Sequence, residues 1–220
     1  MDFRNAKELL KVCQEQSLSI SAVMLQRELT EGEQDPEETD RKMDRVLEIM
    51  KSAASTPIHT PVKSMGGLIG GEAKKISDHK DAGKGLCGDL LERAVIYAMA
   101  TLETNASMGV IVASPTAGSA GIVPGLLLAL QETYDLSDEQ IKQGLYNASA
   151  IGYLAMRNAT VAGAVGGCQA EVGIASAMAA SATVELMGGS PEQSLAAAST
   201  VLMNMLGLVC DPVGGLVEYP

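Results

Sequence analysis

The stretch VAGAVGGCQAEVGIASAMAASATVELM, residues 161–187, is the most apolar part of the chain and decides its fold. It carries two acids, Glu171 and Glu185, and most of its positions are Gly, Ala, Ser or Val. A membrane span is usually built of larger aliphatic residues and rarely holds acids, so this composition argues against one. Small side chains let helix axes approach closely. The stretch therefore predicts a helix over 169–187 that is buried on most sides.

Helical patterns continue on both sides of this stretch. Ser137 and Ser190 each begin a Ser-x-x-Gln sequence, which is typical of a capped helix N-terminus. No convincing run of alternating polar and apolar residues indicates a strand. The sequence therefore predicts an all-α fold, a buried bundle of Gly/Ala/Ser-rich helices joined by glycine-rich loops. The other helices of this part are expected at 89–105, 123–134, 137–158 and 191–208.

The first 55 residues are more charged and predict two or three amphipathic helices, the first of them capped by Asn5 or Asp2. The run Asp35-Pro36-Glu37-Glu38 is a strong start signal for the last, because Asp accepts N–H bonds, Pro fits the first turn and acids suit the positive helix end. We expect residues 1–55 to be a scaffold or docking arm, and residues 56–220 to form the domain that carries function. One apolar face of the last of these helices is formed by Met43, Val46, Leu47 and Met50.

The composition excludes several classes of partner. The 220 residues have a formal net charge of −11, and only 3% of them are aromatic. Such a chain repels phosphate backbones and offers few rings for base stacking, so nucleic acid is not expected as a partner. The N-terminus turns amphipathic and charged after Phe3 and has no apolar core of the kind a signal peptide needs. We expect a cytoplasmic protein that makes no contact with a membrane.

Four cysteines, at positions 13, 87, 168 and 210, are too far apart for a CxxC zinc pair and too few for a disulfide framework. Cys168 precedes a predicted helix, whose N-terminus favours the thiolate that binds iron. Cys210 ends a predicted helix and is followed by Asp-Pro, so its sulfur can stand at a loop edge. A soft metal suits such a pair. Cys13 and Cys87 have no comparable neighbours, and we expect them to be structural thiols.

Several segments of this chain resemble the signature segments of the iron–sulfur L-serine dehydratase alpha chain. The resemblance covers roughly residues 56–220, whereas the N-terminal helices match more loosely. The matching strings are GGCQAEVGIASAMAA from Gly166, GLVCDPVGGLVEYP from Gly207, SPTAGSAGIVPG from Ser114, SMGGLIGGEAKK from Ser64 and NASMGVIVA from Asn105.

The resemblance implies a lyase that converts L-serine to pyruvate and ammonia with a 4Fe–4S cluster held by three cysteines. The first two ligands map onto Cys168 and Cys210. In the family's pattern the third directly follows the motif that ends here at Pro220. We therefore expect the chain to be cut short at its C-terminal end, with a cluster- and substrate-binding domain that is incomplete there. By itself it is expected to be inactive and to hold no stable cluster.

The general base is not assigned to a residue of this chain. His59 lies in a Pro-flanked stretch and His79 in a charged one, outside the matched catalytic segments, and we interpret both as surface histidines. In two-chain members of the family, the resemblance assigns a further part of the site, including a histidine, to a separate beta chain. That beta chain is the expected partner, beside the small-molecule substrate L-serine.

Two loops are candidates for gripping the carboxylate and amine of serine. Glycine-rich backbone at a helix start can turn N–H groups toward an anion, although the same patterns also arise from tight packing or from helix capping by Ser and Thr. The candidate substrate-binding residues are Ser64, Gly67, Gly70, Gly71, Ser114, Thr116, Gly118 and Ser119.

Two alternatives stay open at this point. A related iron–sulfur lyase acting on cysteine would use the same ligands, because only the leaving group changes. A non-catalytic helical protein could instead use its small-residue faces to bind a partner. Steady-state assays with serine and cysteine separate the first alternative from the dehydratase.

Overall fold

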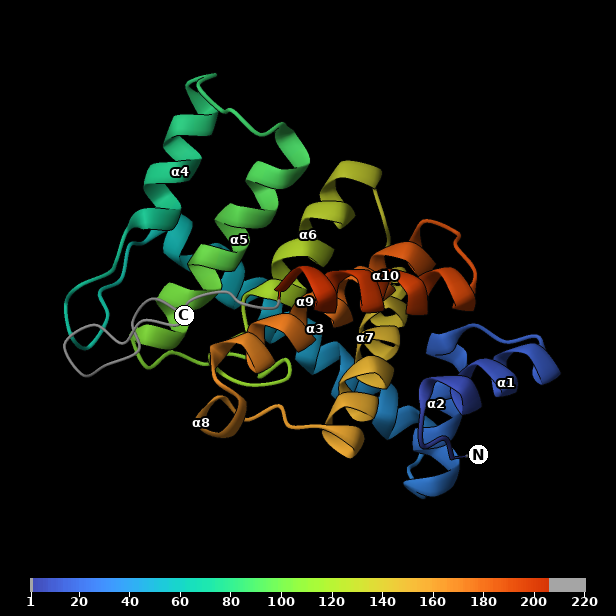
Figure 1. The fold of residues 1–220 in the computed structure, drawn as a ribbon. Coiled ribbons are helices and arrows are strands. Elements are labelled where there is room, and N and C mark those ends of the chain that lie inside the picture. Colours follow the sequence, from blue (N-terminus) through green and yellow to red (C-terminus); the bar gives the residue numbers. More distant parts are fainter. Residues whose placement is uncertain (1, 206–220) are drawn as a thin grey trace.

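The computed structural model describes residues 2–205, and this part of the chain is helical with no strand, which confirms the all-α prediction (Figure 1). None of the described helices is both long and apolar enough to cross a membrane. The helices are α1 (Ala6–Gln16), α2 (Ile20–Glu31), α3 (Pro36–His59), α4 (Glu72–Asp81), α5 (Asp89–Ala106), α6 (Ile122–Tyr134), α7 (Asp138–Asn158), α8 (Gly163–Gly166), α9 (Cys168–Leu186) and α10 (Pro191–Met205).

Three of the helix caps that the sequence predicts are observed, and the other predicted helix starts lie within one residue of the observed ones. Asn5 and Asp35 cap α1 and α3, and Ser137 forms a capping box with Gln140 at α7. Helix α3 continues through Pro57 to His59, so residue 55 lies inside a continuous helix. The helix expected over 191–208 is α10 up to residue 205, and its last positions lie outside the described residues.

Helix α9 lies at the centre of the bundle, in contact with α6, α7, α8 and α10. Small side chains make this packing possible. The sulfur of Met178 on α9 would lie 3.2 Å from a Cβ added at Gly152 of α7, and Leu186 would lie 3.0 Å from one added at Gly144. The buried residues of α9 are Gly173, Ile174, Ala175, Ala177, Met178, Ala179, Ser181 and Ala182.

Two apolar cores stabilise the fold. The larger one joins α3, α6, α7 and α9, and the apolar face predicted for α3 belongs to it through Leu47 and Met50. The smaller one packs α1 and α2 against α7, where Tyr146 and Ala150 meet the N-terminal side chains. Phe3 is fully buried there and meets the ring of Tyr153 edge-on, with 5.4 Å between the ring centroids.

A buried polar network ties the C-terminal end of α9 to α2 and α7. The Glu185 carboxylate accepts hydrogen bonds from the backbone N–H groups of Ile20, at 3.0 Å, and Ser21, at 3.3 Å, at the start of α2. It also accepts one from the side-chain amide N–H of Asn147 at 2.7 Å, and the Ser181 hydroxyl donates to the side-chain Oδ1 of Asn147 at 2.6 Å. Because buried polar groups are costly when unpaired, this network fixes how the three helices meet.

Helices α5 and α6 approach at two glycines. A Cβ added at Gly121 would lie 2.5 Å from the carbonyl oxygen of Ala98, and one added at Gly125 would lie 2.9 Å from that of Ala94. The facing atoms belong to the backbone of α5, so they cannot move away as a flexible side chain could. The close approach depends on glycine at both positions.

The two cysteines that we expected to be structural lie in different surroundings. Cys13 is buried in the smaller core, whereas Cys87 is exposed in the connection before α5. Burial, together with the charges of Glu185 and Glu192, raises the pKa of the Cys13 thiol to about 11. Cys13 is therefore a protonated, apolar side chain at neutral pH.

This pKa predicts a pH dependence of stability. A thiol in an unfolded chain has a pKa of about 8.5, and the folded-state pKa of Cys13 lies above it. The stability that Cys13 contributes is therefore complete below the unfolded value and is lost as the pH rises toward the folded one.

Chemical unfolding of the unsubstituted chain and of Cys13→Ala at pH 8 and pH 10 measures this effect. Between these pH values, the unsubstituted chain should lose about 1–2 kcal/mol more unfolding free energy than Cys13→Ala, which has no thiol to titrate. An equal loss in both chains would contradict the burial of a protonated Cys13.

Candidate functional site

Two of the sequence-predicted loops are anchored at the same place, the C-terminal end of α5. The backbone N–H of Met65, in the glycine run, donates to the carbonyl oxygen of Ala106 at 3.0 Å. The side-chain amide of Asn105 donates to the carbonyl oxygen of Ala117, in the Ser114–Gly121 loop, at 2.9 Å. Adjacent residues of one helix thus hold both loops, on the side of the molecule where α8 and the start of α9 also lie (Figure 1).

The glycine run turns tightly around Ser64. Ser64 is buried, its backbone N–H donates to the Ile69 carbonyl oxygen at 3.0 Å, and its hydroxyl accepts from the Ile69 N–H at 3.3 Å. The Gly67 N–H donates back to the Ser64 carbonyl oxygen at 3.0 Å. Ser64 therefore closes the turn, and its hydroxyl serves the fold of the loop.

Glycine is required in this run for conformation and for space. Gly67, Gly70 and Gly71 have φ values of +71°, +147° and +91°, which side chains rarely adopt. A Cβ at Gly70 would also lie 2.1 Å from the carbonyl oxygen of Val62. These positions allow the backbone to run close to a neighbour, as a backbone-bound ligand would need.

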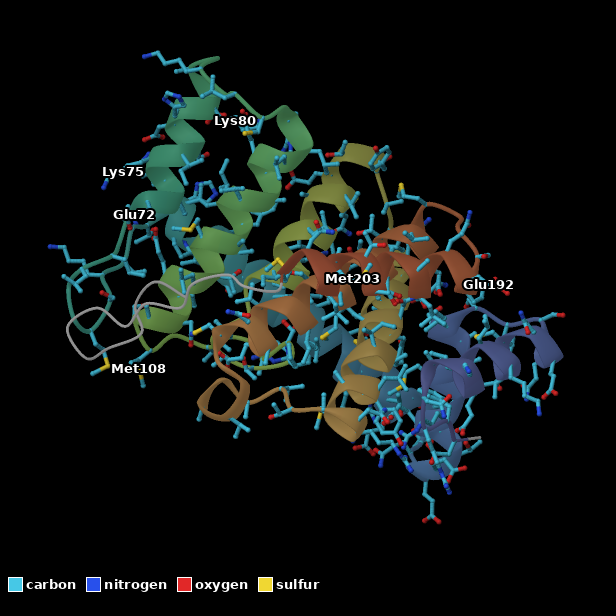
Figure 2. The ribbon with its side chains drawn as sticks, in the orientation of Figure 1. Glu72, Lys75, Lys80, Met108, Glu192 and Met203 are labelled. Carbon is cyan, nitrogen blue, oxygen red and sulfur yellow. The ribbon has the colours of Figure 1, made fainter. Side chains whose placement is uncertain are left out.

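Two carboxylates of the chain accept hydrogen bonds from backbone N–H groups at the start of α4. Glu72 accepts from the Gly70 N–H, which lowers the pKa of the Glu72 carboxyl; Figure 2 shows Glu72 at this end of the helix. Glu103 of α5 is 1% exposed, and its Oε1 accepts from the Ala73 N–H at 2.8 Å. Its Oε2 has no hydrogen-bond partner within residues 2–205. The N–H groups of Gly70 and Ala73 are therefore already occupied by carboxylates of the chain itself.

The hydroxyls of the Ser114–Gly121 loop bond mainly within the loop. The Ser119 hydroxyl donates to the Ser114 carbonyl oxygen at 3.3 Å and lies 3.2 Å from the Thr116 hydroxyl. The Ser114 hydroxyl donates to the Ala120 carbonyl oxygen at 3.5 Å, and both serines are buried. The serines thus set the shape of the loop, and Thr116 is the more accessible of the three hydroxyl residues.

The Ser114–Gly121 loop meets the first turn of α9 through Gly118. A Cβ added at Gly118 would lie 3.1 Å from a carboxylate oxygen of Glu171, and one added at Gly163 of α8 would lie 2.4 Å from the same oxygen. Glu171 is half-buried. Glu171 is not among the site residues predicted from the sequence. Its position three residues after Cys168, on the same face of a helix, would have indicated that it lies near Cys168.

Cys168 is the first residue of α9, as the sequence indicated. It is partly exposed, and Gly167 before it has a φ of +76° that turns the chain into the helix. The positive end of a helix favours a thiolate, so this position fits an iron ligand. The second expected ligand, Cys210, lies outside the described residues. Within residues 2–205, no three His, Cys, Asp or Glu side chains form a group that could hold a metal ion.

The two histidines lie on other elements. His59 is the last residue of α3, and His79 lies in the last turn of α4. Both are exposed, in agreement with their interpretation as surface residues. In the described part of the chain, the glycine run and the Ser114–Gly121 loop are thus held at the C-terminal end of α5, and the Ser114–Gly121 loop also contacts the first turn of α9. Neither histidine takes part in these contacts.

Comparisons with known proteins show to which family the chain belongs. The family model described as "Serine dehydratase alpha chain" matches residues 15–220. The chain is 49% identical over 218 residues to the probable L-serine dehydratase alpha chain of Bacillus subtilis, covering 99% of this chain and 72% of that one. It is 44% identical over 215 residues to the L-serine dehydratase alpha chain of Peptoniphilus asaccharolyticus, covering 98% and 74%. It is 38% identical over 224 residues to the L-serine dehydratase of Streptomyces coelicolor, covering 99% and 48%. The chain therefore belongs to the serine dehydratase alpha chain family.

Proposed function

We propose that this chain is the alpha chain of an L-serine dehydratase, which converts L-serine to pyruvate and ammonia. The observation that carries the proposal is the contact of the Ser114–Gly121 loop with the Cys168 end of α9, beside a glycine run anchored on the same end of α5, in a chain whose relatives are named for this activity. In the reaction, serine loses its α-proton and its β-hydroxyl as water. The resulting enamine becomes an imine, and water hydrolyses the imine to pyruvate and ammonia.

We propose that Cys168 and Cys210 are ligands of a 4Fe–4S cluster. The support within the described residues is the place of Cys168, partly exposed at the positive end of a long helix. When bound, such a cluster supplies a Lewis-acidic iron, which makes hydroxide a better leaving group. The role of the chain itself is to hold the thiolate at a fixed point beside the Ser114–Gly121 loop.

The two loops hold the substrate through backbone groups in this proposal. Positive-φ glycines let the glycine run approach a ligand closely, and Gly118 lets the Ser114–Gly121 loop lie close to the Glu171 carboxylate in the first turn of α9. The buried serines contribute by shaping the loops, because their hydroxyls already bond to loop backbone. The residues proposed to line the substrate site remain Ser64, Gly67, Gly70, Gly71, Ser114, Thr116, Gly118 and Ser119.

We further propose that a beta chain completes the site and supplies the general base. The relatives in Bacillus subtilis and Peptoniphilus asaccharolyticus are named alpha chains, which supports a partner subunit. The exposed His59 and His79 take no part in the contacts that join the loops. Four cysteines in 220 residues are too few for a disulfide framework, and we place the enzyme in the cytoplasm.

Turnover of two amino acids tests the proposed function. The full-length alpha chain, which includes the expected third cluster ligand, is produced together with its beta chain, purified anaerobically and assayed with L-serine and L-cysteine. We expect kcat/KM for L-serine to exceed that for L-cysteine by about 100-fold or more, because a site that binds the substrate hydroxyl discriminates against a substrate without one. Preference for cysteine would indicate the related lyase, and no turnover of either would contradict the proposal.

The anchor at Asn105 yields a second prediction. Asn105→Ala removes the hydrogen bond to the Ala117 carbonyl oxygen and loosens the Ser114–Gly121 loop. Because small misplacements of binding groups are costly in catalysis, kcat/KM for serine should fall by about 10–100-fold while the unfolding midpoint stays nearly unchanged.

A matched control for Asn105→Ala is Gln34→Ala in the α2–α3 connection. The Gln34 amide likewise donates to a backbone carbonyl oxygen, that of Gly32, at 2.8 Å. This variant should retain full activity. Equal activity of the two variants would show that the Asn105 anchor has no role in catalysis.

A further inference from the structure

The carboxylate of Glu171 occupies a space that two glycines leave open. Gly118 belongs to the Ser114–Gly121 loop and Gly163 to α8, and the carboxylate lies against both. A side chain at Gly163 would overlap Glu171, since its Cβ would lie 2.4 Å from an oxygen. The carboxylate is thus held where the loop, α8 and the first turn of α9 meet.

Glu171 has no counter-charge of its own. Within residues 2–205, its carboxylate makes no side-chain hydrogen bond and no ion pair, although the residue is half-buried. Other acids of the chain do have a counter-charge: Asp40, Asp44 and Glu139 all pair with Lys142 at the contact of α3 and α7. A partly desolvated carboxylate is stabilised by a bound cation, and serine carries one in its ammonium group.

Glu171 and Cys168 face the same side of α9. They are three residues apart in one helix, which places their Cβ atoms about 5–6 Å from each other. The amino nitrogen and the hydroxyl oxygen of serine are separated by only three bonds. One serine molecule can therefore reach the Glu171 carboxylate with its ammonium group while its hydroxyl is directed toward the Cys168 side.

We infer that Glu171 binds the ammonium group of the substrate and so orients the β-hydroxyl toward the Cys168 end of α9. This inference rests on the proposed function and names the group that recognises the amino acid's positive charge. The alternative is a purely structural role, in which Glu171 interacts only with the positive end of α9, as acids in the first turn of a helix commonly do.

The test compares two ligands that differ in the amino group. 3-Hydroxypropionate keeps the hydroxyl and carboxylate of serine and lacks the ammonium group. In the alpha–beta complex, Glu171→Gln should raise KM for L-serine about 10–100-fold, as expected for a lost charge-assisted contact. The inhibition constant of 3-hydroxypropionate, the iron content and the unfolding midpoint should stay unchanged. Glu171→Asp, which keeps the charge, should recover part of the serine affinity.

Glu192→Gln is the matched control, because Glu192 also lies in the first turn of a helix, at the start of α10 (Figure 2). It contacts Gln14 at 2.7 Å, and its variant should leave KM unchanged. An unchanged KM in Glu171→Gln, or equal weakening of serine and 3-hydroxypropionate, would overturn the inference while serine turnover upholds the proposed function. Absence of serine turnover in the unsubstituted complex would overturn the proposed function itself, and with it this inference.

Discussion

The close packing of α9 is the constraint on which the rest of the structure depends. Its buried surface is made mostly of Ala, Gly and Ser, so α6, α7 and α10 can all lie against it. Such packing gives little freedom, because each neighbouring side chain is already in contact. At the C-terminal end the Glu185–Asn147 pair fixes α9 to α2 and α7 through hydrogen bonds. The N-terminal end, with Cys168 and Glu171, is thereby presented at a defined place.

Helix α5 supplies the second fixed point. Glycines 121 and 125 seat α6 directly on its backbone, and Asn105 and Ala106 hold the two loops at its C-terminal end. The buried Glu103 of α5 also holds α4 in place, because its carboxylate accepts a hydrogen bond from the Ala73 N–H. A site assembled from loops gains its precision from such supports, since the loops themselves carry few apolar contacts. The chemistry proposed for this family thus rests on two rigid helices and the loops between them.

Much of the fold was predictable from local sequence patterns. Caps such as Asn5, Asp35 and Ser137 mark helix starts through their own side chains, and the small-residue stretch marked α9 as buried. The contacts that build the site were not predictable in this way. The Asn105–Ala117 bond and the Glu171–Gly118 contact join residues whose approach depends on how whole helices pack. Local patterns also could not show that Ser114 and Ser119 turn their hydroxyls into their own loop.

The central proposal is that Cys168, at the N-terminal end of α9, is an iron ligand beside the Ser114–Gly121 loop. Iron content and visible absorption of the alpha–beta complex, measured after anaerobic reconstitution with iron and sulfide, test it most directly. Cys168→Ser should lose the iron and the absorption, whereas Cys87→Ser, which alters an exposed thiol outside the site, should keep both. Retention of iron by Cys168→Ser, at the level of the unsubstituted complex, would contradict the account.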